Sequence, residues 1–445
     1  MTSRLRSRRS FIQELALGAI IAPWVTSGAR ALSPNGKIRH ATFGCSGMAA
    51  SDIEDLAKHP ALEVVAGCDV DEKYFPGFKK KFPNARVYTD FRELLEKERD
   101  LDSVNVSTPD HMHAPIGLAA LQRGLHVYGQ KPLAHDLAEV RALTTLAAEK
   151  KRVTQMGIQI HSSTEYRTAV QLIQSGAIGK VREVHTWSSK KWGDNGAMPD
   201  RTDPIPEGFH WDLWLGVCAD RPFIGHEWYH PGNWRKRLDF GTGTFGDMGC
   251  HIYDPVFAAL ALTAPLSVRS EGPAPNTHSW ATDALIHYEF PGTAFTEGKT
   301  VRVIWYDGDQ RPPAEIQAQA RPADAKEGDK SARIPDQGSI FLGTDGVMLL
   351  PHIKMPTLFG AAAGRPVEKV AGDDHYHQFL RTILGERGNT DASFAYAGPL
   401  TEAVLLGGVA TRFPEKMLEW DAAKLAFTNT PEANAFVRRA YRAGW

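Results

Sequence analysis

Short apolar runs alternate with helical patterns over the first third of the chain. The runs at 38–43, 62–67, 102–107 and 125–128 have the length and the branched side chains of buried strands. Stretches of helical period separate them. Strands that alternate with helices are typical of a parallel sheet with helices on its faces. We therefore expect an α/β domain over residues 37–155.

The pattern changes after residue 155. Strand-like runs then follow one another without intervening helices, at 181–188, 266–270, 284–290, 301–306, 339–342 and 347–350. This order favours an α+β domain over 156–370 whose sheet is mostly antiparallel. Residues 307–337 are rich in Pro, Ala, Asp and Lys and predict a surface loop. Helical patterns at 374–384 and 401–412 predict that the C-terminal part, 371–445, packs back against the first domain.

A glycine-rich turn follows the first apolar run. It reads Gly44-Cys45-Ser46-Gly47-Met48-Ala49, precedes a helical pattern, and lies roughly twenty residues before Asp69 at the end of the second run. In this context the turn predicts a dinucleotide site, with the pyrophosphate at the helix N-terminus and the adenosine ribose on Asp69. Ser46 replaces the usual second glycine, and Asp69 would repel a 2′-phosphate, which favours NAD over NADP. The alternative is a helix–strand pair that binds nothing.

Two later loops carry polar side chains. One reads Thr108-Pro109-Asp110-His111-Met112-His113 and the other reads Gly129-Gln130-Lys131-Pro132, each directly after a predicted strand. Ligands of open parallel sheets bind outside the carboxyl ends of the strands. We therefore assign Thr108, Pro109 and His113 to the cofactor and place Lys131 between cofactor and substrate. A solvent-exposed Lys-Pro loop is the simpler alternative.

A carboxylate and an imidazole lie four residues apart in the second domain. Asp247 and His251 follow a Gly-Thr-Gly turn at 241–243, and on a helix they project from one face. Such a pair can transfer protons. The alternative places Asp247 at a helix cap and His251 in the core.

Together these motifs resemble the Gfo/Idh/MocA oxidoreductases from about Lys37 onward. The resemblance is carried by the glycine turn, by Thr108-Pro109-Asp110-His111, by Lys131-Pro132 and by the segment from Gly246 to Asp254. It implies an NAD(P)-binding Rossmann domain, an α+β domain with a large open sheet, and reaction at a secondary alcohol of a sugar, inositol or derivative. The segments 209–216 and 397–403 are similar to one exported bacterial branch of that family, whose relatives include glucose-fructose oxidoreductase and inositol dehydrogenase.

The resemblance also implies residue roles. Lys131 matches the catalytic lysine of the Glu-Lys-Pro motif, and Asp247 and His251 match the family's D-x-x-x-H motif. Gln130 replaces the glutamate, which would leave Lys131 less stabilised as a cation if the two side chains are close. Relatives often assemble through the open sheet, so we expect a homo-oligomer.

Residues 187–240 are rich in aromatic side chains, which can stack on a sugar. Core packing accounts for more than half of them. Trp192, Trp228 and Tyr229 lie among polar residues and are the predicted substrate contacts. His226, His230, Arg235 and Lys236 are the predicted hydrogen-bond donors to hydroxyls. Three histidine pairs, at 111/113, 226/230 and 375/377, lack a carboxylate at metal-ligand spacing, so we expect no metal.

The N-terminus has the features of an export signal. Arg8-Arg9, an apolar run at 15–25 and Ala29-Arg30-Ala31 predict a twin-arginine signal over 1–31, read by the twin-arginine export machinery, and a periplasmic or otherwise exported protein. Such proteins are exported folded, so we expect the cofactor to be loaded first and the four cysteines to be free thiols, mostly buried. A net charge of −1 argues against nucleic acid as a partner.

The sequence therefore favours an oxidoreductase with tightly held NAD that moves a hydride to or from a secondary alcohol of a sugar, glycoside or polyol. In this hypothesis His251 is the general base, Lys131 contacts the same oxygen, and Asp247 orients the substrate and His251. Two alternatives stay open. One is a redox-neutral glycoside hydrolase or lyase that oxidises the sugar transiently, and the other is a non-catalytic sugar-binding protein.

Overall fold

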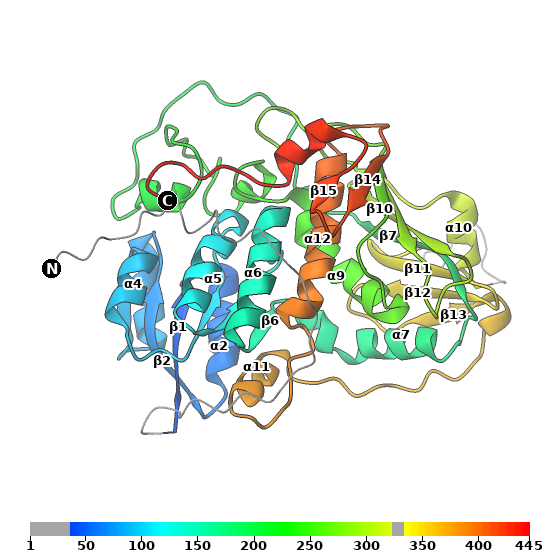
Figure 1. Ribbon diagram of the computed structural model, residues 1–445, viewed down its shortest axis with the longest axis horizontal. Helices are drawn as coiled ribbons and strands as arrows, with labels where there is room; N and C mark the ends of the chain where they lie inside the picture. The colour runs from blue at the N-terminus through cyan, green and yellow to red at the C-terminus, as the bar shows by residue number, and fades with distance from the viewer. Residues whose placement is uncertain (1–35, 323–332) are drawn as a thin grey trace.

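The computed structural model describes residues 36–322 and 333–445. The predicted export signal over 1–31 lies outside these residues. Two sheets lie side by side in the described part, and helices pack between them (Figure 1). No helix in the described ranges is long and apolar enough to cross a bilayer.

The first sheet is parallel and has six strands in the order β3-β2-β1-β4-β5-β6. The strands are β1 (Ile38–Phe43), β2 (Leu62–Cys68), β3 (Arg86–Tyr88), β4 (Ser103–Val106), β5 (His126–Gly129) and β6 (Thr154–Met156). Its helices are α2 (Gly47–Ala57), α3 (Phe75–Lys81), α4 (Phe91–Lys97), α5 (His113–Gln122) and α6 (Leu137–Lys150). The strand order reverses between β1 and β4, and such a switch point is where open parallel sheets bind ligands.

The second sheet has nine strands in the order β13-β12-β11-β7-β10-β9-β8-β14-β15. They are β7 (Val181–Ser188), β8 (Ser267–Ser270), β9 (Leu285–Pro291), β10 (Thr300–Asp307), β11 (Gln337–Gly343), β12 (Val347–Pro351), β13 (Thr357–Phe359), β14 (Leu418–Asp421) and β15 (Ala426–Phe427). Among the described strand pairs, β7 and β10 run parallel and the others run antiparallel. The predicted fold class, a Rossmann domain plus a mostly antiparallel open sheet, is confirmed.

The remaining helices are α7 (Thr164–Gln174), α8 (Trp211–Leu215), α9 (Gly243–Leu260), α10 (Ala314–Gln319), α11 (His375–Ile383) and α12 (Phe394–Ala410). The prediction of a continuous loop over 307–337 was wrong, because this segment contains α10. Ile316 of α10 packs against Trp187, Ile304 and Ile340 on one face of the second sheet. Helix α10 thus covers part of an apolar face of the second sheet.

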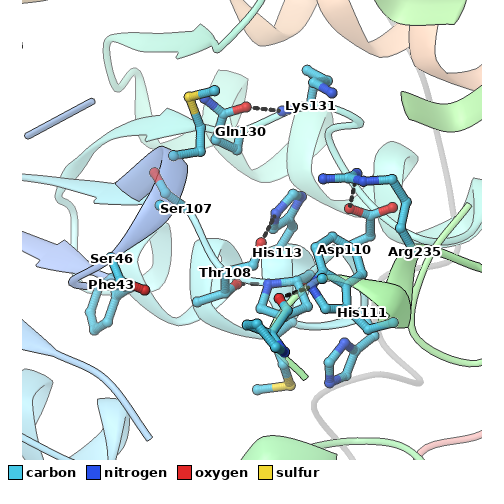
Figure 2. Close-up of a pocket in the computed structure, with 18 of the residues that line it drawn as sticks. Phe43, Ser46, Ser107, Thr108, Asp110, His111, His113, Gln130, Lys131 and Arg235 are labelled. Atoms are coloured by element: carbon cyan, nitrogen blue, oxygen red, sulfur yellow. Dashed lines mark hydrogen bonds and ion pairs between the residues drawn. The ribbon is translucent and has the colours of Figure 1, made fainter. Parts of the chain in front are cut away.

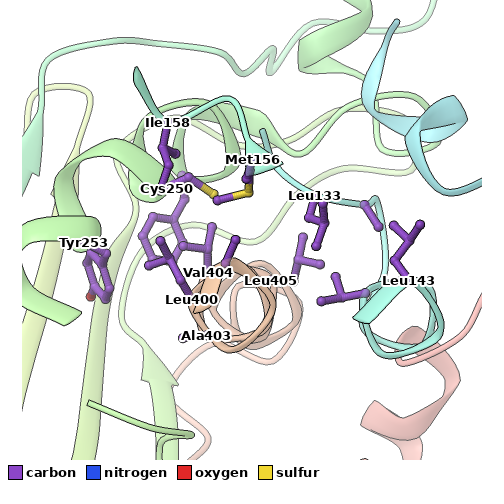
Figure 3. Packing of buried hydrophobic residues seen from close by; sticks show 14 of the residues in the cluster. Leu133, Leu143, Met156, Ile158, Cys250, Tyr253, Leu400, Ala403, Val404 and Leu405 are labelled. Atoms are coloured by element: carbon purple, nitrogen blue, oxygen red, sulfur yellow. The ribbon is translucent and has the colours of Figure 1, made fainter. Parts of the chain in front are cut away.

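Helix α12 joins the two domains, because it packs against α6 of the first and α9 of the second (Figure 1). Figure 3 shows Leu133 and Leu143 on one side of this helix, and Cys250 and Tyr253 on the other. The four cysteines are free and buried, as predicted.

The approach of α12 to α6 depends on a glycine. A Cβ added at Gly398 would lie 2.3 Å from Cγ2 of Thr144 on α6, so a larger residue would push the helices apart. The position of α9, and of the polar residues on it, is therefore fixed relative to the first sheet.

Replacing Leu400 in α12 tests this role. Leu400 is fully buried, so Leu400→Ala should lower the free energy of unfolding by about 2–5 kcal/mol, because it leaves a cavity between the domains. Leu266→Ala is the matched control, since Leu266 is 45% exposed, and it should change stability by about 0.5 kcal/mol or less. Urea unfolding measures both. A change in the free energy of unfolding that is equally small in both variants would show that α12 does not join the domains.

Candidate active site

A cavity of about 800 Å³ lies between the two domains. Its first wall is formed by the carboxyl ends of β1, β2, β4 and β5 and by the loops that follow them. Its second wall is formed by α9, by the segment after β7 and by the end of β12. Figure 2 shows part of the first wall, with Lys131 and His113 on neighbouring loops.

The glycine turn after β1 forms a cradle. Gly44 has a φ of +102°, and a Cβ there would lie 2.7 Å from Cβ of Ala49. Gly47 has a φ of +55° with open space where a Cβ would point. Ser46, the N-cap of α2, makes no side-chain capping bond. A backbone turn at a helix N-terminus, open toward a cavity, fits the pyrophosphate of a dinucleotide.

Asp69 lies at the end of β2 on the same wall. One oxygen of its carboxylate accepts a hydrogen bond from the Cys45 N–H (2.9 Å), and the other accepts one from the Asp71 N–H (3.0 Å). Burial raises the pKa of Asp69 to about 6. The side chain is therefore fixed at the edge of the cavity, where a ribose would lie.

The structure brings all the predicted cofactor residues to this cavity: Gly44, Ser46, Gly47, Met48, Asp69, Thr108, Pro109, His113 and Lys131. His113 connects two of their loops. Its ring nitrogens bond the carbonyl oxygens of Pro132 and Thr108, each at 2.7 Å. The residues present therefore fit a dinucleotide.

Asp247 of α9 is the electrostatic centre of the opposite wall. Its Oδ1 accepts a hydrogen bond from Lys131 Nζ (2.6 Å) and lies 3.3 Å from Arg235 Nη1. Its Oδ2 accepts bonds from Lys190 Nζ (3.1 Å) and Trp192 Nε1 (2.8 Å). Burial alone would raise the pKa of Asp247, but Lys131, Arg235 and Lys190 outweigh burial and hold this pKa well below its ordinary value.

Gln130 does not act on the charge of Lys131. Its side-chain amide donates to both carboxylate oxygens of Asp52 (3.1 and 2.9 Å), and its Oε1 accepts from the backbone N–H of Lys131. The Lys131 ammonium contacts Asp247 instead. The contacts of the Gln130 side chain are thus with Asp52 and with the backbone of Lys131.

His251 lies one turn after Asp247 on α9. Burial, followed by the charge of Lys131 and the neighbouring His352, lowers the pKa of His251 well below its usual value. Its Nδ1 is buried and has no hydrogen-bond partner among the described residues. The oxygens of Asp247 face cations and an indole rather than this ring. His251 is thus a neutral base beside the cavity.

Five of the seven predicted substrate residues line the cavity: Trp192, His230, Arg235, Asp247 and His251. Trp228 and Tyr229 do not. Tyr229 is 2% exposed and packs against Trp211 and Phe240 in an aromatic core. Trp228 packs against the Arg237 guanidinium. His226 and Lys236 are also absent from the lining.

Sequence reasoning missed Lys190, His352 and Asp52. Lys190 follows β7, and nothing in its surroundings distinguishes it from the adjacent Lys191. His352 lies at the end of β12, and its ring centroid is 5.9 Å from that of His251. Lys190 and His352 lie close to α9 only because the fold brings together segments that are far apart in the sequence.

Comparison with known proteins agrees with this geometry. Residues 38–158 match the Gfo/Idh/MocA oxidoreductase family, NAD-binding Rossmann fold, and residues 163–311 match the C-terminal alpha/beta domain of the same oxidoreductases. The chain belongs to the Gfo/Idh/MocA family. Its first domain is thus the NAD-binding Rossmann fold of an oxidoreductase family.

Curated Gfo/Idh/MocA relatives match part of the chain. A levoglucosan dehydrogenase of Pseudarthrobacter phenanthrenivorans is 27% identical over 39% of this chain and 37% of its own length. An inositol 2-dehydrogenase of Salmonella typhimurium is 30% identical over 31% and 42%. An alpha-N-acetylgalactosaminidase of Shewanella oneidensis is 26% identical over 32% and 33%. The matched stretch thus spans less than half of each relative.

Solved structures of this family share the fold. The WlbA dehydrogenase from Bordetella pertussis, in complex with NADH and UDP-GlcNAcA, has a TM-score of 0.59 at 15% identity and covers 86% of this chain and 99% of its own. An aldose-aldose oxidoreductase from Caulobacter crescentus has a TM-score of 0.56 at 14% identity and covers 86% and 100%. At these identities the likeness concerns the fold alone.

The depressed pKa of His251 gives a pH prediction. A base must be unprotonated to accept a proton, so single-turnover hydride transfer with saturating cofactor should stay constant through pH 6.5 and fall only well below it. In Lys131→Met the pH at which the rate falls on the acid side (the acid limb) should move up toward 6.5, because the charge of Lys131 no longer disfavours protonation of His251. Lys191→Met, outside the cavity lining, should leave the limb in place. A wild-type limb at 6.5 would contradict the assignment.

The Gln130–Asp52 contact gives a stability prediction. Gln130→Glu places two buried carboxylates in contact, so it should lower the free energy of unfolding at neutral pH by about 1–3 kcal/mol. Asp52→Asn added to it should restore most of the loss, because the new amide can donate to Glu. Gln171→Glu on the exposed face of α7 is the control, with a change of about 0.5 kcal/mol or less. Additive losses in the double variant, measured by urea unfolding, would contradict the contact.

Proposed function

We propose that this oxidoreductase transfers a hydride to or from a secondary alcohol of a sugar, glycoside or polyol, with NAD tightly held. The convergence of Lys131, Asp247 and His251 beside a dinucleotide-shaped wall carries the proposal. The bound nicotinamide would supply the hydride acceptor or donor. The protein positions the alcohol and moves its proton.

In the direction of oxidation His251 accepts the hydroxyl proton, because its ring is neutral at physiological pH. Lys131 Nζ donates to two oxygens of Asp247, the carboxylate Oδ1 and the backbone carbonyl (2.8 Å). An ammonium has three N–H groups, so one remains for the reacting oxygen. That oxygen gains negative charge during the reaction, which a fixed cation stabilises. Asp247 holds this ammonium in place.

Two segments across the cofactor half of the cavity support tight binding. In the first, His210 donates its backbone N–H to Val70 O (2.8 Å) and His230 bonds Asp71 (2.9 Å), so the second domain is bound to the loop after β2. In the second, Trp445 packs between Phe91 and the Arg92 guanidinium and also lines the cavity. These contacts would hinder the release of a dinucleotide bound on this wall. The Asp69 carboxylate supports NAD over NADP, because it would repel a 2′-phosphate.

One observation favours a second function. His251 and His352 are neighbouring neutral imidazoles, since burial and nearby lysines lower the pKa of His352 to about 4. A redox-neutral glycoside hydrolase or lyase needs a second group to remove a proton from the carbon beside the transient ketone, and the leaving alkoxide takes up a proton. The partial similarity to an alpha-N-acetylgalactosaminidase supports this alternative. A non-catalytic sugar-binding protein would not require the complete Lys131–Asp247–His251 group.

Export through the twin-arginine machinery and homo-oligomerisation remain part of the proposal. The arginine pair and apolar run over 1–31 support export. The large second sheet supports assembly, although α10 occupies part of one of its faces.

Replacing His251 tests the proposed reaction. His251→Ala should lower the turnover of NAD-dependent sugar oxidation by roughly 10²–10⁴-fold, because the proton acceptor is lost, while NAD still binds. His287→Ala on β9, outside the cavity lining, is the matched control and should keep wild-type turnover. Wild-type turnover in His251→Ala would remove this residue from the reaction. Sugar release from a glycoside without change in the NAD/NADH ratio would favour the redox-neutral alternative.

A further inference from the structure

The substrate half of the cavity holds more cations than the proposed reaction requires. Lys131, Lys190 and Arg235 all line it, and each lies within 3.3 Å of the Asp247 carboxylate. All three cations keep the buried Asp247 carboxylate charged, and Lys131 is the one assigned to the reacting oxygen. Lys190 and Arg235 are thus cations at the cavity wall that have no assigned contact with the substrate.

The nearby carboxylates do not balance these charges. Asp247 contributes one negative charge and Asp110 contributes another. Oδ2 of Asp110 accepts bonds from the N–H (3.1 Å) and the hydroxyl (2.7 Å) of Thr242, and its Oδ1 lies 3.8 Å from Arg235. His251 and His352 are neutral, as described above. The lining of this half thus keeps one net positive charge.

Lys190 and Arg235 both have donors left for a ligand. The Lys190 side chain is 43% exposed and donates one hydrogen bond to Asp247, so two N–H groups of its ammonium are left for a ligand. Arg235 packs over Trp234, with its guanidinium carbon 4.4 Å from the ring centroid. Its Nη1 faces Asp247, and the side chain is 20% exposed and lines the cavity. Figure 2 shows this guanidinium directed toward Asp110 at the cavity wall.

We propose that the substrate is a sugar acid, whose carboxylate binds between Lys190 and Arg235 while Lys131 and His251 act on its reacting hydroxyl. The inference rests on the proposed function and names its substrate class. A carboxylate matches the single excess positive charge, whereas a phosphate monoester carries about −1.5 to −2 at neutral pH. The guanidinium also suits a planar carboxylate. Trp192 borders the same space, with the Arg235 guanidinium carbon 5.7 Å from its ring centroid.

Matched pairs of substrates test the proposal on the cofactor-loaded protein. Glucuronate and galacturonate are compared with glucose and galactose, and kcat/KM is measured for each. The wild type should prefer the acid of each pair by about tenfold or more, because a charge-assisted hydrogen bond contributes about 1.5–3 kcal/mol. In Lys190→Gln the acid-to-neutral ratio should fall by about the same factor. Equal kcat/KM values for acid and neutral sugars, or an unchanged ratio in Lys190→Gln, would overturn the inference.

Lys191→Gln is the matched control. Lys191 is the adjacent lysine, pairs with Asp309 and lies outside the cavity lining, so its replacement should leave the ratio unchanged. Calorimetric binding of glucuronate and glucose to wild type and Lys190→Gln distinguishes the acid-binding site from the proposed reaction. Tighter binding of glucuronate that depends on Lys190, without turnover, supports the acid site and contradicts the proposed reaction. Oxidation of neutral sugars without preference for the acid supports the reaction and contradicts the acid site.

Discussion

The buried carboxylate of Asp247 is the constraint on which the site depends. A charge inside a protein is tolerated only when partners compensate for the lost water, and removing one partner is costly. Asp247 obtains its partners from three segments, namely the loop after β5 (Lys131), the segment after β7 (Lys190) and the turn at 233–236 (Arg235). One carboxylate on α9 thereby positions a lysine of the first domain against residues of the second.

The rest of the fold holds this carboxylate at a fixed position relative to the cavity wall formed by the first domain. Helix α12 packs against both α6 and α9, and Gly398 permits the close approach to Thr144. The ring nitrogens of His113 contact the loops after β4 and β5, so the Thr108 loop and the Lys131 loop are held together. The contacts of His230 and Trp445 then cross the dinucleotide half of the same cavity. A site built this way suits a cofactor that stays bound while substrates exchange.

The sequence predicted the features of the fold that depend on local residue patterns. The strands at 181–188 and 347–350 and the turn at Gly44–Met48 follow from periodicity and glycine placement, and the i, i+4 spacing placed Asp247 and His251 on one helix. Strands β3, β6, β13 and β15 were missed because they span only two or three residues, too short for a periodic signal. Strand β14 was missed as well, although other strands of four residues were predicted. Trp228 and Tyr229 lie outside the cavity lining, because polar neighbours in the sequence do not show which residues are neighbours in the fold. Lys190 and Asp52 carry no sequence signal, since their roles come from the Asp247 and Gln130 side chains that the fold brings to them.

Chemical rescue of Asp247→Ala tests the central claim most directly. If this carboxylate positions Lys131, the variant should lose most single-turnover hydride transfer to bound NAD. Added formate should restore part of it, because a small carboxylate can occupy the space between the cations, while chloride at the same ionic strength should not. Wild-type transfer in the variant without formate, or equal rescue by formate and chloride, would contradict the account.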